Sequence, residues 1–130
     1  MTSRGQHDLT GDSPNDLILD VQGALERIGG DRELFRELAS IFAEDGPLLL
    51  NSLAASIAQD DCVAAQHFAH GLKGMAANVG GVRLELLCYQ LETATRNGEL
   101  PATTADTDRL GAELTRLISA LKMTVLGGAT

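Results

Sequence analysis

The chain is poor in aromatic residues: its 130 positions include three Phe, one Tyr and no Trp. A core must therefore come from Leu, Ala, Ile and Val, a composition that suits helices. Basic residues are also few, with 10 Lys and Arg against 18 Asp and Glu and a formal net charge of -8. This balance disfavours binding to nucleic acid or to an anionic membrane surface, so we expect protein partners.

Cysteine is scarce as well. The two cysteines, Cys62 and Cys88, have no Cys-x-x-Cys or metal-ligand spacing. Helical rise separates them by roughly 15 Å, which excludes a disulfide and predicts two inert thiols in a reducing compartment. The aliphatic run Leu48-Leu49-Leu50 is too short to span a membrane, and the first 14 residues lack the apolar stretch of a signal peptide. We expect a cytoplasmic location without direct membrane contact.

Length and composition predict a single domain, because 44% hydrophobic residues are enough for one compact core and too few for two. Residues 1–14 carry Gly, Ser, Asp, Asn and Pro with little apolar content, so we interpret them as a disordered leader or linker remnant. The folded domain is expected over residues 15–126, and residues 127–130 as a frayed tail.

Apolar periodicity, Asp caps and glycine stops divide this domain into helices. A short helix runs from the cap Asp20 to Ile28 and ends at Gly29-Gly30. Residues 31–58 form one bent unit, with Gly46-Pro47 predicting a kink or a restart. Further helices are expected over 62–79, 82–96 and about 105–126, the last with the stripe Leu110, Leu114, Leu117, Leu121 and Val125. The prediction is an all-α antiparallel four-helix bundle with an additional short N-terminal helix.

The helix over 62–79 has two contrasting faces. Its predicted core stripe is Phe68, Leu72, Met75 and Val79. The opposite face consists of Gln66, His67, His70, Lys73, Gly74 and Ala77. Because His70 lies roughly 160° from the centre of the stripe, its side chain is predicted to face solvent.

A lone exposed histidine is most often an idle side chain, but the neighbours of His70 favour chemistry. Gly71 and Gly74 lie inside the helix, where each costs about 1 kcal/mol relative to Ala. Gly74 shares the face of His70, which favours a docking partner over internal packing. Lys73 brings an ammonium within reach of an anion on the imidazole, although it also fits an ordinary solubilising residue. Together these residues predict a nucleophile that accepts a phosphoryl group from a docked donor.

The segment from Ala69 to Gly80, with His70-Gly71-Leu72-Lys73-Gly74 at its start, resembles the His-x-Leu-Lys-Gly-x5-Gly signature of histidine phosphotransfer (HPt) domains. Residues 25–31 and Gln90-Leu91-Glu92 also resemble this family, so that the likeness covers about residues 17 to 124.

The resemblance implies a phosphorelay intermediate: His70 takes a phosphoryl group from the aspartate of one receiver domain and passes it to another receiver's aspartate. It implies Lys73 as the neighbour of the phosphate, Gly74 as the close-contact glycine and Gly80 as the helix-ending glycine. Gln66, His67 and Ala77 complete the expected receiver-docking surface. No cofactor is expected on this chain, and Mg²⁺ is expected on the partner receiver. Candidate partners include the receiver domain of a hybrid histidine kinase.

The next helix supplies two further candidates. Counted from the turn at residues 80–81, His70 lies about 15 Å down its helix and Glu92 about 16 Å down the antiparallel one. Glu92 is therefore predicted to hydrogen-bond the imidazole and fix its tautomer, as a Gln or Glu is thought to do in relatives. Arg96, one turn beyond, is predicted to face a phosphate. For both residues a solvated helix surface is the open alternative.

Other kinds of site fit less well. His67 and His70 form a His-x-x-His pair, but no third ligand lies nearby, so we expect no metal site. The family often has Ser or Ala at the position of Met75, which we interpret as a packing residue. The chain has no phosphate-binding glycine loop or Walker motif and no second domain for ATP, so we expect a phosphotransfer intermediate without autokinase activity rather than an enzyme.

One alternative function remains open: an interaction module that sequesters or regulates a partner enzyme or kinase through the same helical face. The sequence fits both a free-standing protein and the cytoplasmic end of a membrane-bound hybrid sensor kinase. We expect a monomer, because one exposed histidine per bundle is sufficient.

Overall fold

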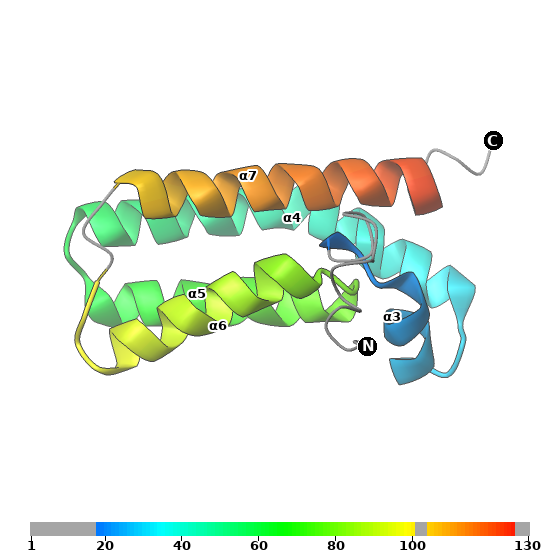
Figure 1. The fold of residues 1–130 in the computed structure, drawn as a ribbon, viewed down its shortest axis with the longest axis horizontal. Helices are drawn as coiled ribbons and strands as arrows, with labels where there is room; N and C mark the ends of the chain where they lie inside the picture. Colours follow the sequence, from blue (N-terminus) through cyan, green and yellow to red (C-terminus); the bar gives the residue numbers. More distant parts are fainter. Residues whose placement is uncertain (1–17, 101–103, 127–130) are drawn as a thin grey trace, which may run out of the picture.

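The computed structural model describes residues 18–100 and 104–126, and within these ranges the chain is helical with no strand (Figure 1). The leader predicted over 1–14 and the tail predicted over 127–130 lie outside the described residues. The α-helices are α3 (Val21–Arg27), α4 (Arg32–Ala58), α5 (Cys62–Asn78), α6 (Val82–Arg96) and α7 (Thr104–Leu121), and the π-helical turn η1 (Lys122–Leu126) follows α7.

The starts of three helices are fixed by aspartate caps. The carboxylates of Asp20, Asp31 and Asp61 each accept a hydrogen bond from the backbone N–H three residues further on, at 2.9 to 3.0 Å. Each bond satisfies one of the N–H groups that the first helical turn leaves without a partner. The bounds predicted for α3 to α6 therefore agree with the structure to within one residue.

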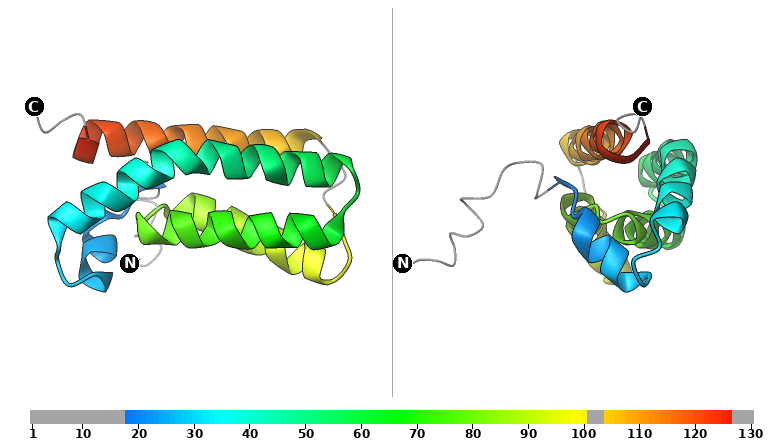
Figure 2. Two further views of the ribbon diagram at one scale, coloured as in Figure 1. Left: turned by 180° about the vertical axis from the view of Figure 1, so that it is seen from behind. Right: turned by 90° about the vertical axis from the view of Figure 1, so that its right-hand side faces the viewer.

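The predicted interruption of the second helix is a bend rather than a restart. Pro47 lies inside α4, which remains one helix of 27 residues and changes direction along its length (Figure 2). A proline inside a helix removes one backbone hydrogen bond and crowds the preceding turn, which accounts for the bend. A Cβ at the adjacent Gly46 would lie 3.2 Å from Leu114, so the glycine lets α7 pack closely against α4.

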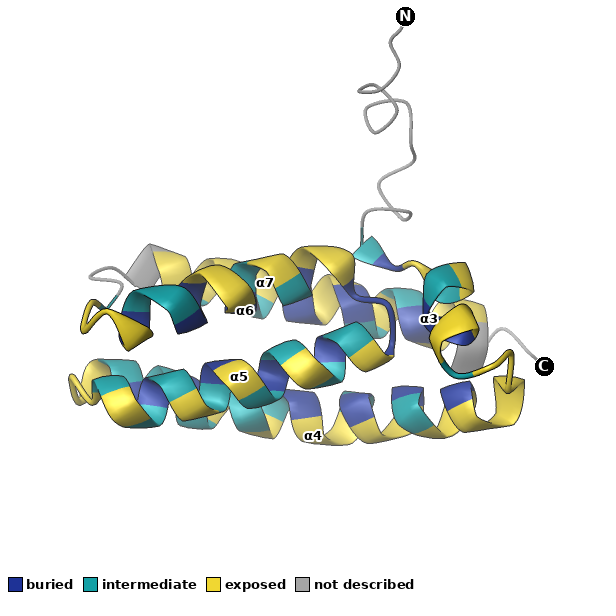
Figure 3. Cartoon of the chain, turned by 90° about the horizontal axis from the view of Figure 1, so that it is seen from below, coloured by how far each residue is buried: buried dark blue, intermediate teal, exposed yellow. Residues whose placement is uncertain are grey.

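Helices α4 to α7 form the four-helix bundle, in which α5 and α6 make an antiparallel hairpin and α7 lies beside α4 (Figure 1). The short α3 lies at one end of the bundle, where the N–H of Asp20 donates to the carbonyl of Gly80 at 2.7 Å. Buried residues face the interior between the helices, and exposed residues cover their outer sides (Figure 3). The largest fully buried side chains include Phe42, Leu53, Leu72, Leu84, Leu117 and Leu121.

The core face of α5 differs from the prediction. Its fully buried residues are Ala65, Ala69, Leu72, Ala76 and Val79. Phe68 and Met75, both predicted for the core, are only partly buried at its edge. The face is rotated by roughly 50° toward the alanines, because small side chains let α5 approach its neighbours closely. On α7, Leu110, Leu114, Leu117 and Leu121 are buried as predicted, whereas the side chain of Val125 lies outside the described residues.

The two thiols are free, as the separation along the helices predicted. Burial raises the pKa of the Cys88 thiol to about 12, so this group stays protonated and unreactive at neutral pH. No helix in the described ranges combines the length and the apolar character needed to cross a membrane.

Candidate functional site

The outer face of α5 presents His70 to solvent. The exposed fraction of the His70 side chain is 68%. His67 and Gly74 are exposed on the same face, while Gln66 and Ala77 are partly buried along it. The 50° rotation of the core face therefore leaves His70 on the side away from the bundle interior.

His70 is bonded to Glu92 of the neighbouring helix α6. The distance between His70 Nδ1 and Glu92 Oε2 is 2.8 Å, which places the two residues at the level expected from the helical rise. The exposed fraction of the Glu92 side chain is only 7%, so the alternative of a solvated surface position does not apply to it. An exposed imidazole is thus anchored on one ring nitrogen by a buried carboxyl group.

The charge of Glu92 determines the tautomer of His70. The ammonium of Lys73, which forms an ion pair with Glu92, lowers the pKa of that carboxyl most, and the bond with His70 adds to this effect against the raising effect of burial. An ionised carboxylate only accepts hydrogen bonds, so the neutral imidazole donates through Nδ1–H. Its Nε2 then carries the free lone pair.

Lys73 is more enclosed than the sequence indicated. The exposed fraction of its side chain is 24%, and its Nζ lies 2.6 Å from Glu92 Oε1. The same Nζ is 5.6 Å from the centroid of the Tyr89 ring, within cation–π distance. The alternative of an ordinary solubilising lysine is therefore wrong: Lys73 is part of the network around Glu92.

Arg96 also faces Glu92. Its Nη2 is 3.5 Å from Glu92 Oε2 across one helical turn, and 54% of its side chain is exposed. Three groups that can carry positive charge, the His70 imidazole, the Lys73 ammonium and the Arg96 guanidinium, thus converge on one buried carboxylate.

The two glycines of the motif have different surroundings. A Cβ at Gly71 would make ordinary contact with Leu49 of α4, at 3.7 Å. A Cβ at Gly74 would meet nothing within 4 Å. Packing within the described chain therefore does not require glycine at position 74, and its open surface lies one turn from His70.

His67 stands apart from this network. Its ring packs edge-on against Phe68, with 5.3 Å between the ring centroids. In the part of the chain that the structure describes, no group of three His, Cys, Asp or Glu side chains has the arrangement of a metal site.

Tyr89 is the site residue that sequence reasoning missed. It lies on α6 one turn before Glu92, is 53% exposed, and covers the ammonium of Lys73. Its spacing of three residues from Glu92 on a helix is the signal that would have placed it on this surface.

Comparison with known proteins agrees with this geometry. The family model of the Hpt domain matches residues 37–121. The histidine-containing phosphotransfer protein B (HptB) of Pseudomonas aeruginosa PAO1 has a similar structure, with a TM-score of 0.74 and 28% identity over 86% of this chain and 95% of that chain. The HPT domain of a sensor hybrid histidine kinase from Shewanella has the same fold, with a TM-score of 0.72 and 20% identity over 82% of this chain and 92% of that chain. A search of curated proteins found no match.

Proposed function

The chain belongs to the Hpt domain family of phosphorelay phosphotransfer modules, and from this premise we propose that His70 is the residue that carries the phosphoryl group. It accepts the group from the aspartyl phosphate of one receiver domain and passes it to the aspartate of another. The observation that supports this assignment is the exposed imidazole whose Nδ1 is bonded to buried Glu92, which leaves Nε2 open.

In the proposed transfer, the lone pair of His70 Nε2 attacks the phosphorus of the aspartyl phosphate. An N–P bond forms as the P–O bond to the aspartyl carboxylate breaks, and the carboxylate leaves with the bonding electrons. The proton on Nδ1 stays in place, so the phosphorylated ring carries positive charge that the Glu92 carboxylate stabilises. Passage to the second receiver is the reverse of the same step.

Lys73 and Arg96 are proposed to stabilise the phosphoryl oxygens. Both side chains pair with Glu92: Lys73 lies one turn after His70 on α5, and Arg96 lies one turn after Glu92 on the antiparallel α6. The phosphoryl group adds negative charge beside them, and a short rotation of either side chain exchanges one anionic partner for the other.

The receiver is proposed to dock over Gly74, with Gln66, His67 and Ala77 at the border of the contact. The open space above Gly74 supports close approach of another backbone. The Mg²⁺ ion of the reaction is assigned to the receiver, and this chain contributes neither a cofactor nor ATP chemistry. We further propose that the protein is a monomer and acts in the cytoplasm. Its proposed partners include the receiver domains of hybrid kinases.

The test uses a receiver domain carrying labelled phosphate, with Mg²⁺ and the full chain. Label is expected on this chain as an acid-labile, alkali-stable phosphoramidate. His70→Gln should abolish it, whereas the matched variant His67→Gln, one turn away and outside the Glu92 network, should retain it. Labelling of the His70→Gln protein would show that the site is wrong. Labelled ATP and Mg²⁺ without a kinase should leave the chain unlabelled.

The same variant separates a relay from sequestration of a partner enzyme or kinase. Loss of both phosphotransfer and the effect on that partner supports the relay. If His70→Gln loses transfer but still inhibits or activates the partner, the interaction itself is the function.

A further inference from the structure

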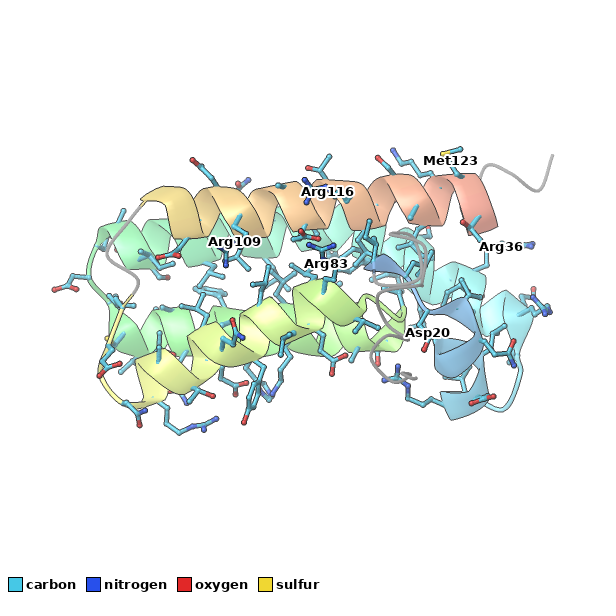
Figure 4. All side chains as sticks on the ribbon, viewed as in Figure 1. Asp20, Arg36, Arg83, Arg109, Arg116 and Met123 are labelled. Atoms are coloured by element: carbon cyan, nitrogen blue, oxygen red, sulfur yellow. The ribbon has the colours of Figure 1, made fainter. Side chains whose placement is uncertain are left out.

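A groove between α6 and α7 lies outside the His70 site. Its volume is about 510 Å³, within the size range of ligand-binding clefts. The lining residues are Arg83, Leu86, Leu87, Arg109, Ala112, Glu113 and Arg116. Arg83, Arg109 and Arg116 come from the two helices that border the groove, as the labelled side chains show (Figure 4).

Glu113 holds two of these arginines in place. The distances from its Oε2 are 2.7 Å to Arg116 Nη1 and 3.3 Å to Arg83 Nη2, and its side chain is 5% exposed. The two arginine side chains are 54% and 45% exposed, so each guanidinium keeps several N–H donors toward solvent. Glu113 thus orders the guanidinium groups without covering them.

Neutralising a buried glutamate is the simpler structural explanation, but it does not account for the whole cluster. One guanidinium balances the charge of Glu113, and the groove contains three. The excess positive charge lies on a chain whose formal net charge is -8. A local cationic surface on an acidic protein favours an anionic ligand.

The spacing of the cluster selects the kind of anion. Arg109 and Arg116 are seven residues apart on α7, which is roughly 10 Å of helical rise. The Glu113 carboxylate lies between Arg83 and Arg116, so it repels a compact anion such as phosphate placed between those two side chains. Side chains on one face of an extended peptide recur every two residues, so two carboxylates four residues apart, separated by roughly 13 Å, leave room for one apolar side chain between them. The long arginine side chains reach over the difference.

The groove also has an apolar part. Leu86, which is 55% exposed, borders it together with Leu87 and Ala112. An apolar side chain between the two acidic residues of a peptide would cover Leu86 while the carboxylates pair with the arginines.

We propose that the α6–α7 groove binds an acidic segment of a partner protein in extended conformation, with two carboxylates four residues apart and an apolar residue midway between them. This contact is separate from phosphoryl transfer, because the groove borders the side of α6 that faces α7, whereas Glu92 faces α5 and His70. The groove adds affinity for a partner independently of the phosphorylation state of His70.

The test measures binding of a fluorescent peptide that contains the pattern Glu-Ser-Leu-Ser-Glu, against a control peptide with Gln for Glu. The full chain should bind the first peptide and not the second. Arg109→Gln and Leu86→Gln, which leave the Glu113 ion pairs intact, should each raise Kd about fivefold, as expected for loss of one pair or apolar contact of about 1 kcal/mol. Arg36→Gln, on exposed α4 away from the groove, is the matched control and should leave Kd unchanged (Figure 4).

Three outcomes would overturn the proposal. The first is equal binding by the wild type, Arg109→Gln and Leu86→Gln. The second is displacement of the peptide by inorganic phosphate more strongly than by chloride at equal ionic strength, which would assign the groove to a small anion. The third is a several-fold gain in peptide affinity on deletion of residues 1–17, which would assign it to the chain's own N-terminal segment. Phosphotransfer to His70 is expected to be equal in the wild type, Arg109→Gln and Leu86→Gln, so a failure of this proposal is distinguishable from a failure of the proposed function.

Discussion

Lys73 and Glu92 form one ion pair, yet removing either partner should have very different consequences for stability. Lys73→Met retains an apolar side chain but removes one partner of the Glu92 carboxylate, whose side chain is 7% exposed. The remaining partners of Glu92 are the His70 imidazole and the half-exposed Arg96 at 3.5 Å. Breaking a buried pair from one side costs about 3 to 5 kcal/mol, and the two remaining partners reduce the expected loss in the free energy of unfolding to about 2 kcal/mol.

Glu92→Gln removes the buried charge itself. Lys73 and Arg96 are then able to turn to water, and the amide oxygen still accepts the bond from His70 Nδ1. We expect a loss below about 1 kcal/mol. The double variant should resemble Glu92→Gln, because Lys73 has no buried charge left to balance.

Urea unfolding followed by the helical circular dichroism signal at pH 7 measures all three free energies. For a domain of this size, about 2 kcal/mol corresponds to a fall in Tm of roughly 7 to 9 °C. An equal cost for Lys73→Met and Glu92→Gln would refute the reasoning.

The pH dependence provides a second check. In the wild type the lowered pKa of Glu92 means that its pairs stabilise the fold above the ordinary pKa of a carboxyl group, and that this contribution fades as the pH falls through the folded value. Lys73→Met removes the largest cause of that lowering, so burial then raises the pKa and protonation relieves the buried charge. The stability gap between the variant and the wild type should therefore narrow between pH 7 and about pH 5. A constant gap would contradict this account.

Three further perturbations have defined outcomes. Gly74→Gln should raise the free energy of unfolding by about 0.5 to 1 kcal/mol through helix propensity while lowering receiver affinity at least about tenfold; unchanged affinity in a titration would exclude docking at this position. Gly80→Ala should lower the free energy of unfolding by at least about 2 kcal/mol, because Gly80 has a φ of 79° and a Cβ there would overlap the Asp20 carbonyl. Gly98→Ala, at a φ of 81° with open space around it, should lower it by about 1 kcal/mol. Equal losses on urea unfolding would argue against the overlap. At pH 8 a thiol reagent should modify Cys62 in the native protein and Cys88 only after unfolding, and early labelling of Cys88 would contradict its burial.

The limits of the helices were predictable because their signals are local. An aspartate at a cap satisfies N–H groups within its own turn, and a glycine with positive φ just past the last turn, as at Gly29, Gly80 and Gly98, ends a helix locally. The common level of His70 and Glu92 followed from the rise of 1.5 Å per residue, which does not depend on side-chain packing. These features need no knowledge of the neighbouring helices.

The rotation of α5 and the position of Lys73 were not predictable in the same way. A helical wheel weights Phe68 and Met75 above alanine, but close packing of α5 turns its alanines inward instead. Lys73 has four flexible carbons, so its burial depends on Glu92 and Tyr89 of another helix. Glu113 shows the same limit, since one of its two arginine partners, Arg83, comes from α6, whereas only Arg116 lies on its own helix.

The convergence of Lys73 and Arg96 on Glu92 also determines the net charge of the site before and after the proposed transfer. With His70 neutral, the charges of Lys73, Arg96 and Glu92 sum to one positive charge. The proposed transfer of a phosphoryl group to His70, with its proton count unchanged, adds one negative charge and would make the phosphorylated site neutral. Neither state of the proposed site therefore accumulates a large uncompensated charge. A phosphotransfer intermediate must both accept and release the phosphoryl group, so a large net charge in either state would be unfavourable. Glu92 keeps the net charge small because it offsets one of the two permanent cations.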